Sequence, residues 1–328
     1  EGTTVLLEGL AEPAPEGADA LNQTGFTTLN PSGINQPRRY GFHVKIAVAC
    51  RQNKARSPFA ELVIRHHFPD FLVSSFGVEV SDGEDTSDFA ALVAQRWGLS
   101  PMKTITTSKE KFLASKFRPE LVLAADQKIF ESISQLGIPG AHRSLTDDYI
   151  HPELKPSDPD GMEESQFERE LAKVANTVLR TIYEWKGWKN RDKVISFIPR
   201  GTTDISQTIA HAIFEARALG AVLIDGDCRA PHDFDLKNNS LTPIDFDYTK
   251  ALSESAPKLR PNEILRHSRE LDKPEKYFLS QSWKALVDSY SRTSPVVIIT
   301  SPRRSKARSL PDSILASYFS DSINVISS

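Results

Sequence analysis

The sequence predicts an α/β protein of two domains, each a parallel sheet flanked by helices. A chain of 328 residues exceeds what one hydrophobic core usually organises. Short apolar runs of the buried-strand type alternate with helical periods, which is typical of parallel sheets covered on both faces. This alternation restarts after residues 187–192. We therefore expect a lead-in over 1–41, a first domain over 42–188 and a second over 189–328.

The lead-in is rich in Pro, Gly, Asn, Thr and Ala and has no helical or strand period. Its composition predicts an extended, poorly ordered segment. An ordered segment packed on a domain surface is the alternative, because Val5, Leu6 and Leu7 offer apolar contacts. The chain opens on Glu1, so we expect a fragment or an excised piece, and membrane attachment by an upstream segment stays open.

Composition narrows the class of protein. The hydrophobic and charged fractions, 39% and 25%, are those of an ordinary globular protein, and a net charge of -3 argues against a broad nucleic-acid-binding surface. No segment approaches the ~18 apolar residues of a membrane span, and no secretory signal is present. Cys50 and Cys228 have neither a metal-ligand spacing nor enough partners for a disulfide framework. A reducing cytoplasm is the expected compartment.

The elements of the first domain follow from apolar runs and helix starts. The run 44–49 ends at Cys50, and Ser57-Pro58 then supplies an N-cap with proline at the first helical position. The second run is closed by Gly77. The predicted strands are 44–49, 71–75 and 121–125. The predicted helices are one that begins at Ser57 and those near 87–97, 108–116, 127–136 and 162–186.

The second domain repeats the alternation around a polar, proline-containing region over about 230–260. Its predicted strands are 194–198, 221–224, 296–299 and 323–326. Its predicted helices are 205–219, 261–271, 277–290 and 311–319. We therefore expect a second parallel sheet with helices on it.

The loop from Cys50 to Ser57 predicts an anion-binding site with a nucleophile. A strand that ends in a loop and enters a helix points several backbone N–H groups into one concavity, which binds a tetrahedral oxyanion. Arg56 adds a two-pronged donor, and these positive charges should stabilise a thiolate at Cys50, to which Ser57 is expected to donate. Attack on a phosphate monoester would form a thiophosphate. The predicted phosphate-binding residues are Arg51, Gln52, Asn53, Lys54, Ala55 and Ser57.

A structural interpretation of the same segment is the alternative. In it, Cys50 is a buried strand-end residue and the arginines are surface charges, since a C-x5-R spacing often arises by chance. The apolar strand before Cys50, the Ser57-Pro58 helix start and the internal Asn53 favour the anion-binding interpretation.

The loop resembles that of the low-molecular-weight protein tyrosine phosphatases, which has the form C-x-x-N-x-x-R-S followed by P-x-A-E. The matching residues are Cys50, Asn53, Arg56, Ser57, Pro58, Ala60 and Glu61. Ser75-Phe76-Gly77 is similar to the Ser-x-Gly of that family at the end of the second strand. The resemblance covers about residues 43–187 and implies a phosphatase with catalytic residues Cys50 and Arg56.

Cleavage of a phosphate ester also needs an acid for the leaving oxygen. In the family this acid is the aspartate of an Asp-Pro pair before the last helix, and Asp158-Pro159 matches it. The resemblance therefore makes Asp158 the third catalytic residue, with Asp160 nearby as a second candidate. The alternative is a turn residue that precedes proline.

Two positions depart from the family pattern. Gln52 stands where the family usually has glycine, which eases an unusual backbone conformation. Asp160-Gly161 follows the Asp-Pro pair, where the family commonly has aromatic residues that hold a phosphotyrosine ring. Arg51 and Lys54 are the candidates to compensate at the rim, and a preference for another anion is the alternative.

Arsenate reductases of related fold share this loop and form an alternative function. The thioredoxin-coupled kind needs further cysteines to relay a disulfide, and Cys228 in the second domain is the other one present. A kind that uses a small external thiol needs Cys50 alone and stays open.

The second domain resembles bacterial tyrosine kinases and MinD-like ATPases over about residues 192–328. The segment 224–229 has the form Asp-x-Asp-x-Arg after a strand, and 199–203 lies where the phosphate-binding loop is expected. The segments 261–265 and 296–302 are similar to a helix start and a strand of those kinases. The resemblance implies a nucleotide-binding fold.

The residues needed for kinase chemistry are replaced in this domain. Thr202 stands at the position of the loop lysine and Thr300 at that of the second metal-binding aspartate. Asp225 and Asp227 are the candidates for a metal ion, and ordinary acidic residues at a strand end are the alternative. We therefore expect a domain without catalysis that serves docking or oligomerisation.

These observations predict a phosphatase for phosphate monoesters, with protein phosphotyrosine as the substrate. Analogy between the two resembling families suggests a link to polysaccharide export. The expected partners are a phosphoprotein, a bacterial tyrosine kinase and a second copy of the chain through the second domain. No cofactor and no nucleic acid are expected. A thiol-dependent arsenate reductase and a non-catalytic phosphate-binding scaffold remain the alternatives.

Overall fold

The computed structural model describes residues 43–99, 101–148, 150–187, 194–199, 221–226, 242–260, 263–269, 271–294, 297–299, 314–318, 320 and 322–326. Residues His43–Ser328 belong to one compact unit. The predicted lead-in and the predicted helix over 205–219 lie outside the described residues. The division into domains near residue 188 stays a prediction.

The first sheet contains the predicted strands and one more. Its described strands run parallel in the order β2-β1-β3-β4. Their bounds are Lys45–Cys50 for β1, Leu72–Gly77 for β2, Leu121–Ala124 for β3 and Ala141–Ser144 for β4. β4 was not predicted, because its sequence AHRS has no apolar run and it lies at the sheet edge. The parallel arrangement places Cys50 at the carboxyl end of a central strand.

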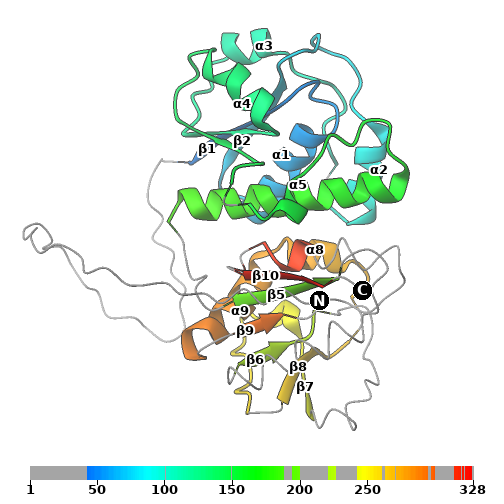
Figure 1. The fold of residues 1–328 in the computed structure, drawn as a ribbon, viewed down its shortest axis with the longest axis vertical. Helices are drawn as coiled ribbons and strands as arrows, with labels where there is room; N and C mark the ends of the chain where they lie inside the picture. The colour runs from blue at the N-terminus through cyan, green and yellow to red at the C-terminus, as the bar shows by residue number, and fades with distance from the viewer. Residues whose placement is uncertain are drawn as a thin grey trace, which may run out of the picture. The chain divides into compact units, whose positions relative to one another are not determined.

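Helices cover both faces of this sheet, as predicted. Figure 1 shows α3 and α4 on one face and α1 and α5 on the other. Side chains alternate along β1, so Ile46 and Val48 join one core cluster while Ala47 and Ala49 join the other. The helix bounds are Arg56–His67 for α1, Asp88–Arg96 for α2, Lys109–Ala114 for α3, Gln127–Ser134 for α4 and Glu164–Trp185 for α5.

Side-chain caps explain where several of these helices begin. The side chains of Ser87, Ser108 and Asp126 accept hydrogen bonds from the backbone N–H groups of the first turns of α2, α3 and α4. A short 3-10 helix, Pro152–Leu154, precedes the loop that leads into α5.

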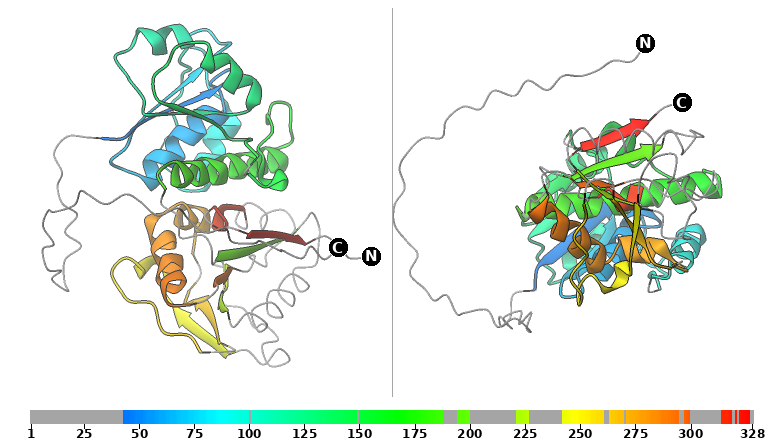
Figure 2. Two further views of the ribbon diagram at one scale, coloured as in Figure 1. Left: turned by 60° about the vertical axis from the view of Figure 1, so that its left-hand side comes forward. Right: turned by 90° about the horizontal axis from the view of Figure 1, so that it is seen from below.

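The second sheet is also parallel, as predicted, with the described strands in the order β10-β5-β9-β6-β8-β7. Both views of Figure 2 show β5 and β10, which are green and red, side by side. The strands are β5 (Val194–Pro199), β6 (Val222–Ile224), β7 (Thr242–Phe246), β8 (Glu263–His267), β9 (Val297–Ile299) and β10 (Ser322–Ile326). A 3-10 helix (Tyr248–Lys250), α8 (Pro274–Phe278) and α9 (Gln281–Thr293) complete the described elements.

One prediction for this region was wrong, and one strand was not predicted. The residues expected to form a helix over 261–271 form β8, because Ile264 and Leu265 are buried and their backbone pairs with β6 and β7. Pairing with neighbouring strands overrides a local helical pattern. β7 lies inside the polar, proline-containing region over about 230–260, at the outer edge of the sheet, where its backbone pairs with β8.

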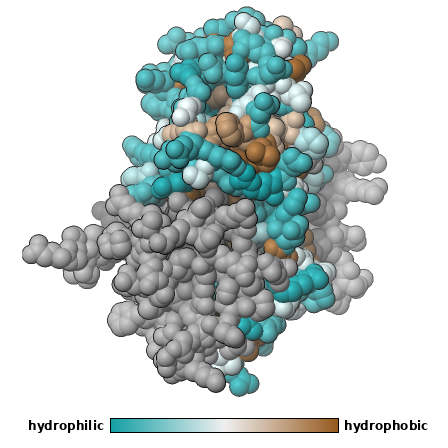
Figure 3. All heavy atoms as spheres, turned by 90° about the vertical axis from the view of Figure 1, so that its right-hand side faces the viewer, coloured by the Kyte–Doolittle hydropathy of each residue, from teal (hydrophilic) through white to brown (hydrophobic). Residues whose placement is uncertain are grey.

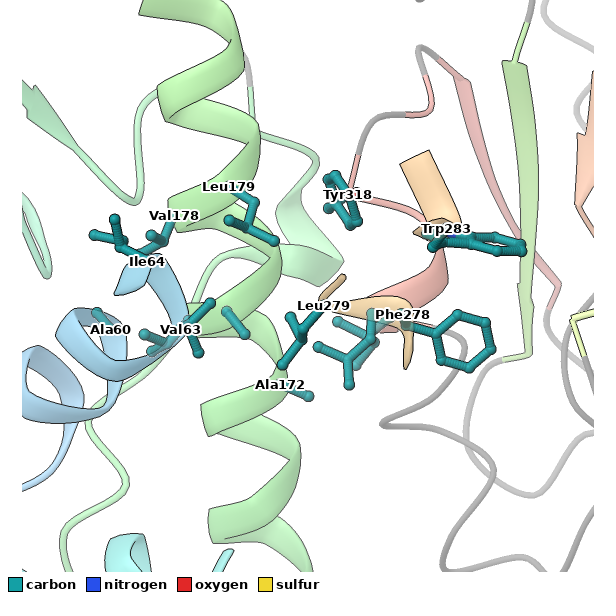
Figure 4. Packing of buried hydrophobic residues seen from close by; sticks show 14 of the residues in the cluster. Ala60, Val63, Ile64, Ala172, Val178, Leu179, Phe278, Leu279, Trp283 and Tyr318 are labelled. Atoms are coloured by element: carbon teal, nitrogen blue, oxygen red, sulfur yellow. The ribbon is translucent and has the colours of Figure 1, made fainter. Parts of the chain in front are cut away.

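Helix α5 packs between helix α1, which covers the first sheet, and residues that follow α8 and precede β10 of the second sheet. Figure 4 shows Val63 and Ile64 of α1 on one side of α5 and Leu279 and Tyr318 on the other. α5 also contributes buried polar side chains to this packing. Arg180 Nη1 and Nη2 donate to the carbonyl oxygens of Ser320 and Ser317, each at 2.8 Å. These carbonyls therefore find partners away from water.

The face in Figure 3 is mostly hydrophilic over the residues that are coloured, with a smaller hydrophobic area between hydrophilic ones. The larger exposed apolar side chains among the described residues include Phe89 and Leu92 of α2. Within the described part of the chain, no helix has the length and apolar character needed to cross a membrane.

Candidate active site

A small pocket opens where β1 ends and α1 begins. Its volume is about 110 Å3. The lining residues are Cys50, Arg51, Gln52, Lys54, Ala55, Arg56, Ser87, Asp158, Pro159, Asp160 and Phe167. The structure thus brings Asp158 to the same pocket as Cys50 and Arg56, although it lies about a hundred positions later in the chain. Asn53 and Ser57 lie beneath the loop and are fully buried.

The Cys50 sulfur is the acceptor of two kinds of donor. The backbone N–H of Asn53 donates to Sγ at 3.1 Å, and the hydroxyl of Ser57 donates to it at 3.0 Å. Cys50 is 3% exposed, and its pocket side is open to a ligand. Two donors are therefore aimed at the sulfur atom that lines the pocket.

Asn53 holds the shape of the loop. Its φ angle is 54°, which makes it the non-glycine residue in the left-handed region among the described residues. Asparagine adopts this region more readily than most residues. Gln52 is not in that region, so the replacement of glycine at this position does not strain the loop in the way the sequence suggested.

The Asn53 amide is the centre of a buried network. Nδ2 donates to Ser57 Oγ at 2.9 Å and to Ser75 Oγ at 3.1 Å. The Ser75 hydroxyl in turn donates to Glu61 at 2.6 Å. Oδ1 accepts from Lys103 Nζ at 2.6 Å and from the backbone N–H of Thr107 at 2.8 Å. We call Asn53, Ser57, Ser75, Glu61 and Lys103 the loop network.

Gly77, two residues after Ser75, lies too close to the loop for any side chain. A side-chain carbon at Gly77 would lie 2.9 Å from both the Asn53 nitrogen and the Gln52 carbonyl carbon. The end of β2 therefore has to be glycine for the loop to pass. Beyond it, the N–H of Val78 donates to the Cys50 carbonyl at 3.1 Å, which fixes the loop to the extended end of β2.

Arg56 begins α1 and is buried, with both ends of its guanidinium group paired. Nη1 donates to Asp126 Oδ2 and Nη2 to Asp158 Oδ2, each at 2.8 Å. Arg51 Nη2 lies 3.8 Å from Asp158 and 3.6 Å from Asp160. The pocket therefore presents two guanidinium groups and two carboxylates at one mouth, which suits a tetrahedral anion together with an acid.

Several residues of the site were not predicted. Asp126 caps α4 and orients Arg56, and an acidic residue between strand β3 and a helix was the available signal. Lys103 lies in an irregular segment before α3, and nothing in its local sequence points to the loop. Phe167 lies in the segment predicted as the helix near 162–186 and was not predicted for the site.

Of the two metal candidates of the second domain, the structure describes Asp225, which does not line this pocket. Asp225 follows β6, where it is 2% exposed and its N–H donates to the Leu265 carbonyl at 2.8 Å. Asp227, Cys228, Thr202 and Thr300 lie outside the described residues. Among the residues that the structure describes, no group of three His, Cys, Asp or Glu side chains is arranged to hold a metal.

Comparison with known proteins returned structural similarity alone, since no family model and no curated protein matches the chain. The tyrosine phosphatase Wzb from Escherichia coli K30 is 23% identical over 44% of this chain and 99% of that chain, with a TM-score of 0.38. The tyrosine phosphatase amsI of Erwinia amylovora is 19% identical over 44% and 95%, with a TM-score of 0.37. The arginine phosphatase YwlE from Geobacillus stearothermophilus is 18% identical over 44% and 94%, with a TM-score of 0.37. At these values the similarities decide neither activity nor substrate, which have to be inferred from the pocket.

Proposed function

We propose that this protein is a phosphatase that hydrolyses phosphate monoesters through a cysteinyl-phosphate intermediate. The observation that carries the proposal is the Arg56–Asp158 ion pair at 2.8 Å on the pocket that Cys50 lines. Nucleophile, phosphate-binding group and acid then reach one bound ester, as in-line displacement requires. The resemblance of the loop to the low-molecular-weight tyrosine phosphatases supports the same roles.

The reaction has two steps. The Cys50 thiolate attacks phosphorus, an S–P bond forms, the ester P–O bond breaks, and the Asp158 carboxylic acid donates its proton to the leaving oxygen. In the second step the Asp158 carboxylate takes a proton from water, whose oxygen attacks phosphorus. The S–P bond breaks, and inorganic phosphate and the thiolate are released. Arg56 and the loop N–H groups stabilise the equatorial oxygens in both steps.

The ion pair between Arg56 and Asp158 belongs to the pocket without substrate. A phosphate that docks on the loop competes with the Asp158 carboxylate for Arg56 Nη2. The displaced Asp158 carboxyl group can then turn toward the leaving oxygen of the bound ester, to which it has to donate its proton. Substrate binding therefore positions the acid.

Protein phosphotyrosine is the substrate that we propose. Phe167 and Pro159 line the pocket and supply apolar contacts for an aryl group, although Asp160-Gly161 carries no aromatic ring. The second sheet is then a degenerate nucleotide-binding fold without its own chemistry, which docks a bacterial tyrosine kinase or a second copy of the chain. A cytoplasmic location and a link to polysaccharide export belong to the same proposal.

Hydrolysis of para-nitrophenyl phosphate tests the proposal. Cys50→Ser should lower kcat by at least about 1,000-fold, because the nucleophile is lost. Asp158→Asn should lower it by roughly 100-fold or more, because the leaving oxygen goes unprotonated. A Cys50→Ser variant with wild-type turnover would refute the mechanism. A larger loss in Asp160→Asn than in Asp158→Asn would move the acid to Asp160.

The same assays separate the alternatives. Turnover of arsenate that requires an added thiol, without hydrolysis of aryl phosphates, would indicate an arsenate reductase. Phosphate binding without turnover of either substrate would indicate a scaffold. Trapping a phosphoryl group on Cys50 by rapid acid quench and peptide mass spectrometry would support the covalent intermediate directly.

A further inference from the structure

Lys103 is a cation beneath the loop that the loop motif does not include. It lies between α2 and α3 and is partly buried. Its ammonium group donates to Asn53 Oδ1 at 2.6 Å, to the Ser75 carbonyl at 3.0 Å and to Thr107 Oγ1 at 3.3 Å. These acceptors match the three N–H bonds of an ammonium group, so the side chain is held in one position.

The direction of every proton in the loop network follows from this donor. An ammonium group can only donate, so the Asn53 atom facing Lys103 has to be the carbonyl oxygen. The amide nitrogen then faces Ser57 and Ser75 and donates to both. The Ser57 oxygen accepts from Asn53, and of the two acceptors within reach of its own proton, Cys50 Sγ at 3.0 Å is nearer than the Phe76 carbonyl oxygen at 3.5 Å.

The charge of Lys103 faces mostly acidic groups. Burial lowers the pKa of Lys103. The negative charges of Glu61, Cys50 and Asp82 oppose this effect, and the positive charge of Arg65 adds to it. Glu61 is itself bonded to Ser75 and lies 2.6 Å from the Arg65 guanidinium. The ammonium group is thus the cation that contacts Asn53, the residue whose N–H donates to the sulfur.

We propose that Lys103 is a positioning residue that stabilises the Cys50 thiolate through Asn53 and Ser57. It acts in two ways, by polarising the Asn53 amide and by placing a positive charge next to the network. The Thr107 N–H also donates to Asn53 Oδ1, so the orientation of the amide survives when Lys103 is neutral. The charge is then the part that Lys103 alone supplies. This inference deepens the proposed function, because it concerns the nucleophile of that reaction.

The rate of Cys50 alkylation by iodoacetamide as a function of pH tests this role without any turnover. The rate is followed on the Cys50 peptide by mass spectrometry, so Cys228 does not interfere. In Lys103→Met the midpoint of the rate profile should move up by about one pH unit or more, because an adjacent cation favours the charged form of an acid. Lys103→Gln keeps a donor for Asn53 but lacks the charge, and it should move the midpoint by a similar amount. Lys103→Arg should restore the wild-type midpoint to within a few tenths of a unit.

Lys109→Met is the matched control, since Lys109 loses only a distant contact with Glu110 at 3.9 Å. It should leave the alkylation midpoint at the wild-type value. A wild-type midpoint in Lys103→Gln, with a folded protein by circular dichroism, would overturn the charge role. If Lys103→Met does not fold, the comparison of Gln with Arg still decides. Because alkylation requires no phosphatase activity, failure of the proposed function leaves this result interpretable.

Discussion

The loop network beneath Cys50 and the polar contacts around α5 are both buried, yet their hydrogen bonds end on different groups. The loop network ends on a sulfur atom that is open to a pocket. The α5 contacts, made by His67, Asn176 and Arg180, end mostly on backbone carbonyls. The first arrangement directs its donors to a group that can react. The second satisfies acceptors that packing has removed from water.

The consequence is a separation of activity from stability. A change in the loop network should alter a reacting charge while leaving the apolar core intact. A change around α5 should leave buried carbonyls without partners, at a cost of about 1–3 kcal/mol each. The pocket lies at the end of β1, whereas Asn176 and Arg180 join α5 to residues 314–320 and His67 joins the end of α1 to Leu279 and to Tyr183 of α5. The two effects are therefore expected to be independent.

Among variants that keep the Cys50 nucleophile and separate the two regions, Arg56→Lys should produce the largest effect on activity. Lysine keeps the charge but loses the planar, two-pronged donor that Arg56 presents to the phosphate and to Asp126. We expect kcat/KM for an aryl phosphate to fall by about 100-fold to 1,000-fold, which corresponds to about 3–4 kcal/mol in transition-state stabilisation. The urea midpoint should change much less. If Arg56→Lys lost stability in proportion to its activity, the separation of activity from stability between the two regions would be contradicted.

Arg180→Met should produce the converse result. It removes the donors to the carbonyls of Ser317 and Ser320, while the methionine retains much of the apolar stem. We expect the free energy of unfolding to fall by about 3 kcal/mol in urea titration, with kcat per folded molecule unchanged. Arg118→Met is the matched control, because Arg118 also donates to carbonyls, those of Ser115 and Phe117, but is exposed. Equal losses in both variants would contradict the argument from burial.

The two regions also differ in how far the sequence could predict them. Cys50, Arg56 and the start of α1 were predictable because a buried strand, a helix start and a loop motif are all local patterns. The membership of Asp158 in the same site was predicted only by resemblance, and its pairing with Arg56 was not predicted. Lys103 and Asp126 were not predicted, because their contacts with Asn53 and Arg56 depend on chain segments that the fold brings together.

The contacts around α5 were even harder to predict from the sequence. The helix itself was predicted, but nothing in its sequence indicated that the polar side chains of Asn176 and Arg180 are buried. They are buried because α5 packs on both sides, which no local pattern of one helix reveals. The same reason applies to β8, whose identity as a strand depends on its neighbours β6 and β7. Such long-range pairing leaves no local pattern in the sequence.

A change at His67 should have the smallest effect on stability. This effect is specific, because it depends on pH. Its ring nitrogen Nδ1 donates to the Leu279 carbonyl and Nε2 accepts from the Tyr183 hydroxyl, each at 2.7 Å. Burial lowers the pKa of His67 from 6.5 to about 3. Above pH 6.5 the residue is neutral in both states. Below it the unfolded chain binds a proton that the folded chain refuses, so stability falls as the pH falls toward about 3.

Between pH 7 and pH 5 this effect should cost the wild-type protein about 2 kcal/mol. His67→Gln should remove that part of the pH dependence, as measured by urea unfolding at both values. Tyr183→Phe keeps His67 buried while deleting one hydrogen bond, so it should lower stability at both pH values and retain the slope. If His67→Gln kept the wild-type slope, His67 would not be the source of the acid sensitivity, and that source would have to be sought in another group. If the slope vanished while kcat at pH 7 stayed constant, the separation between the reactive network and the structural contacts would hold in its strictest form.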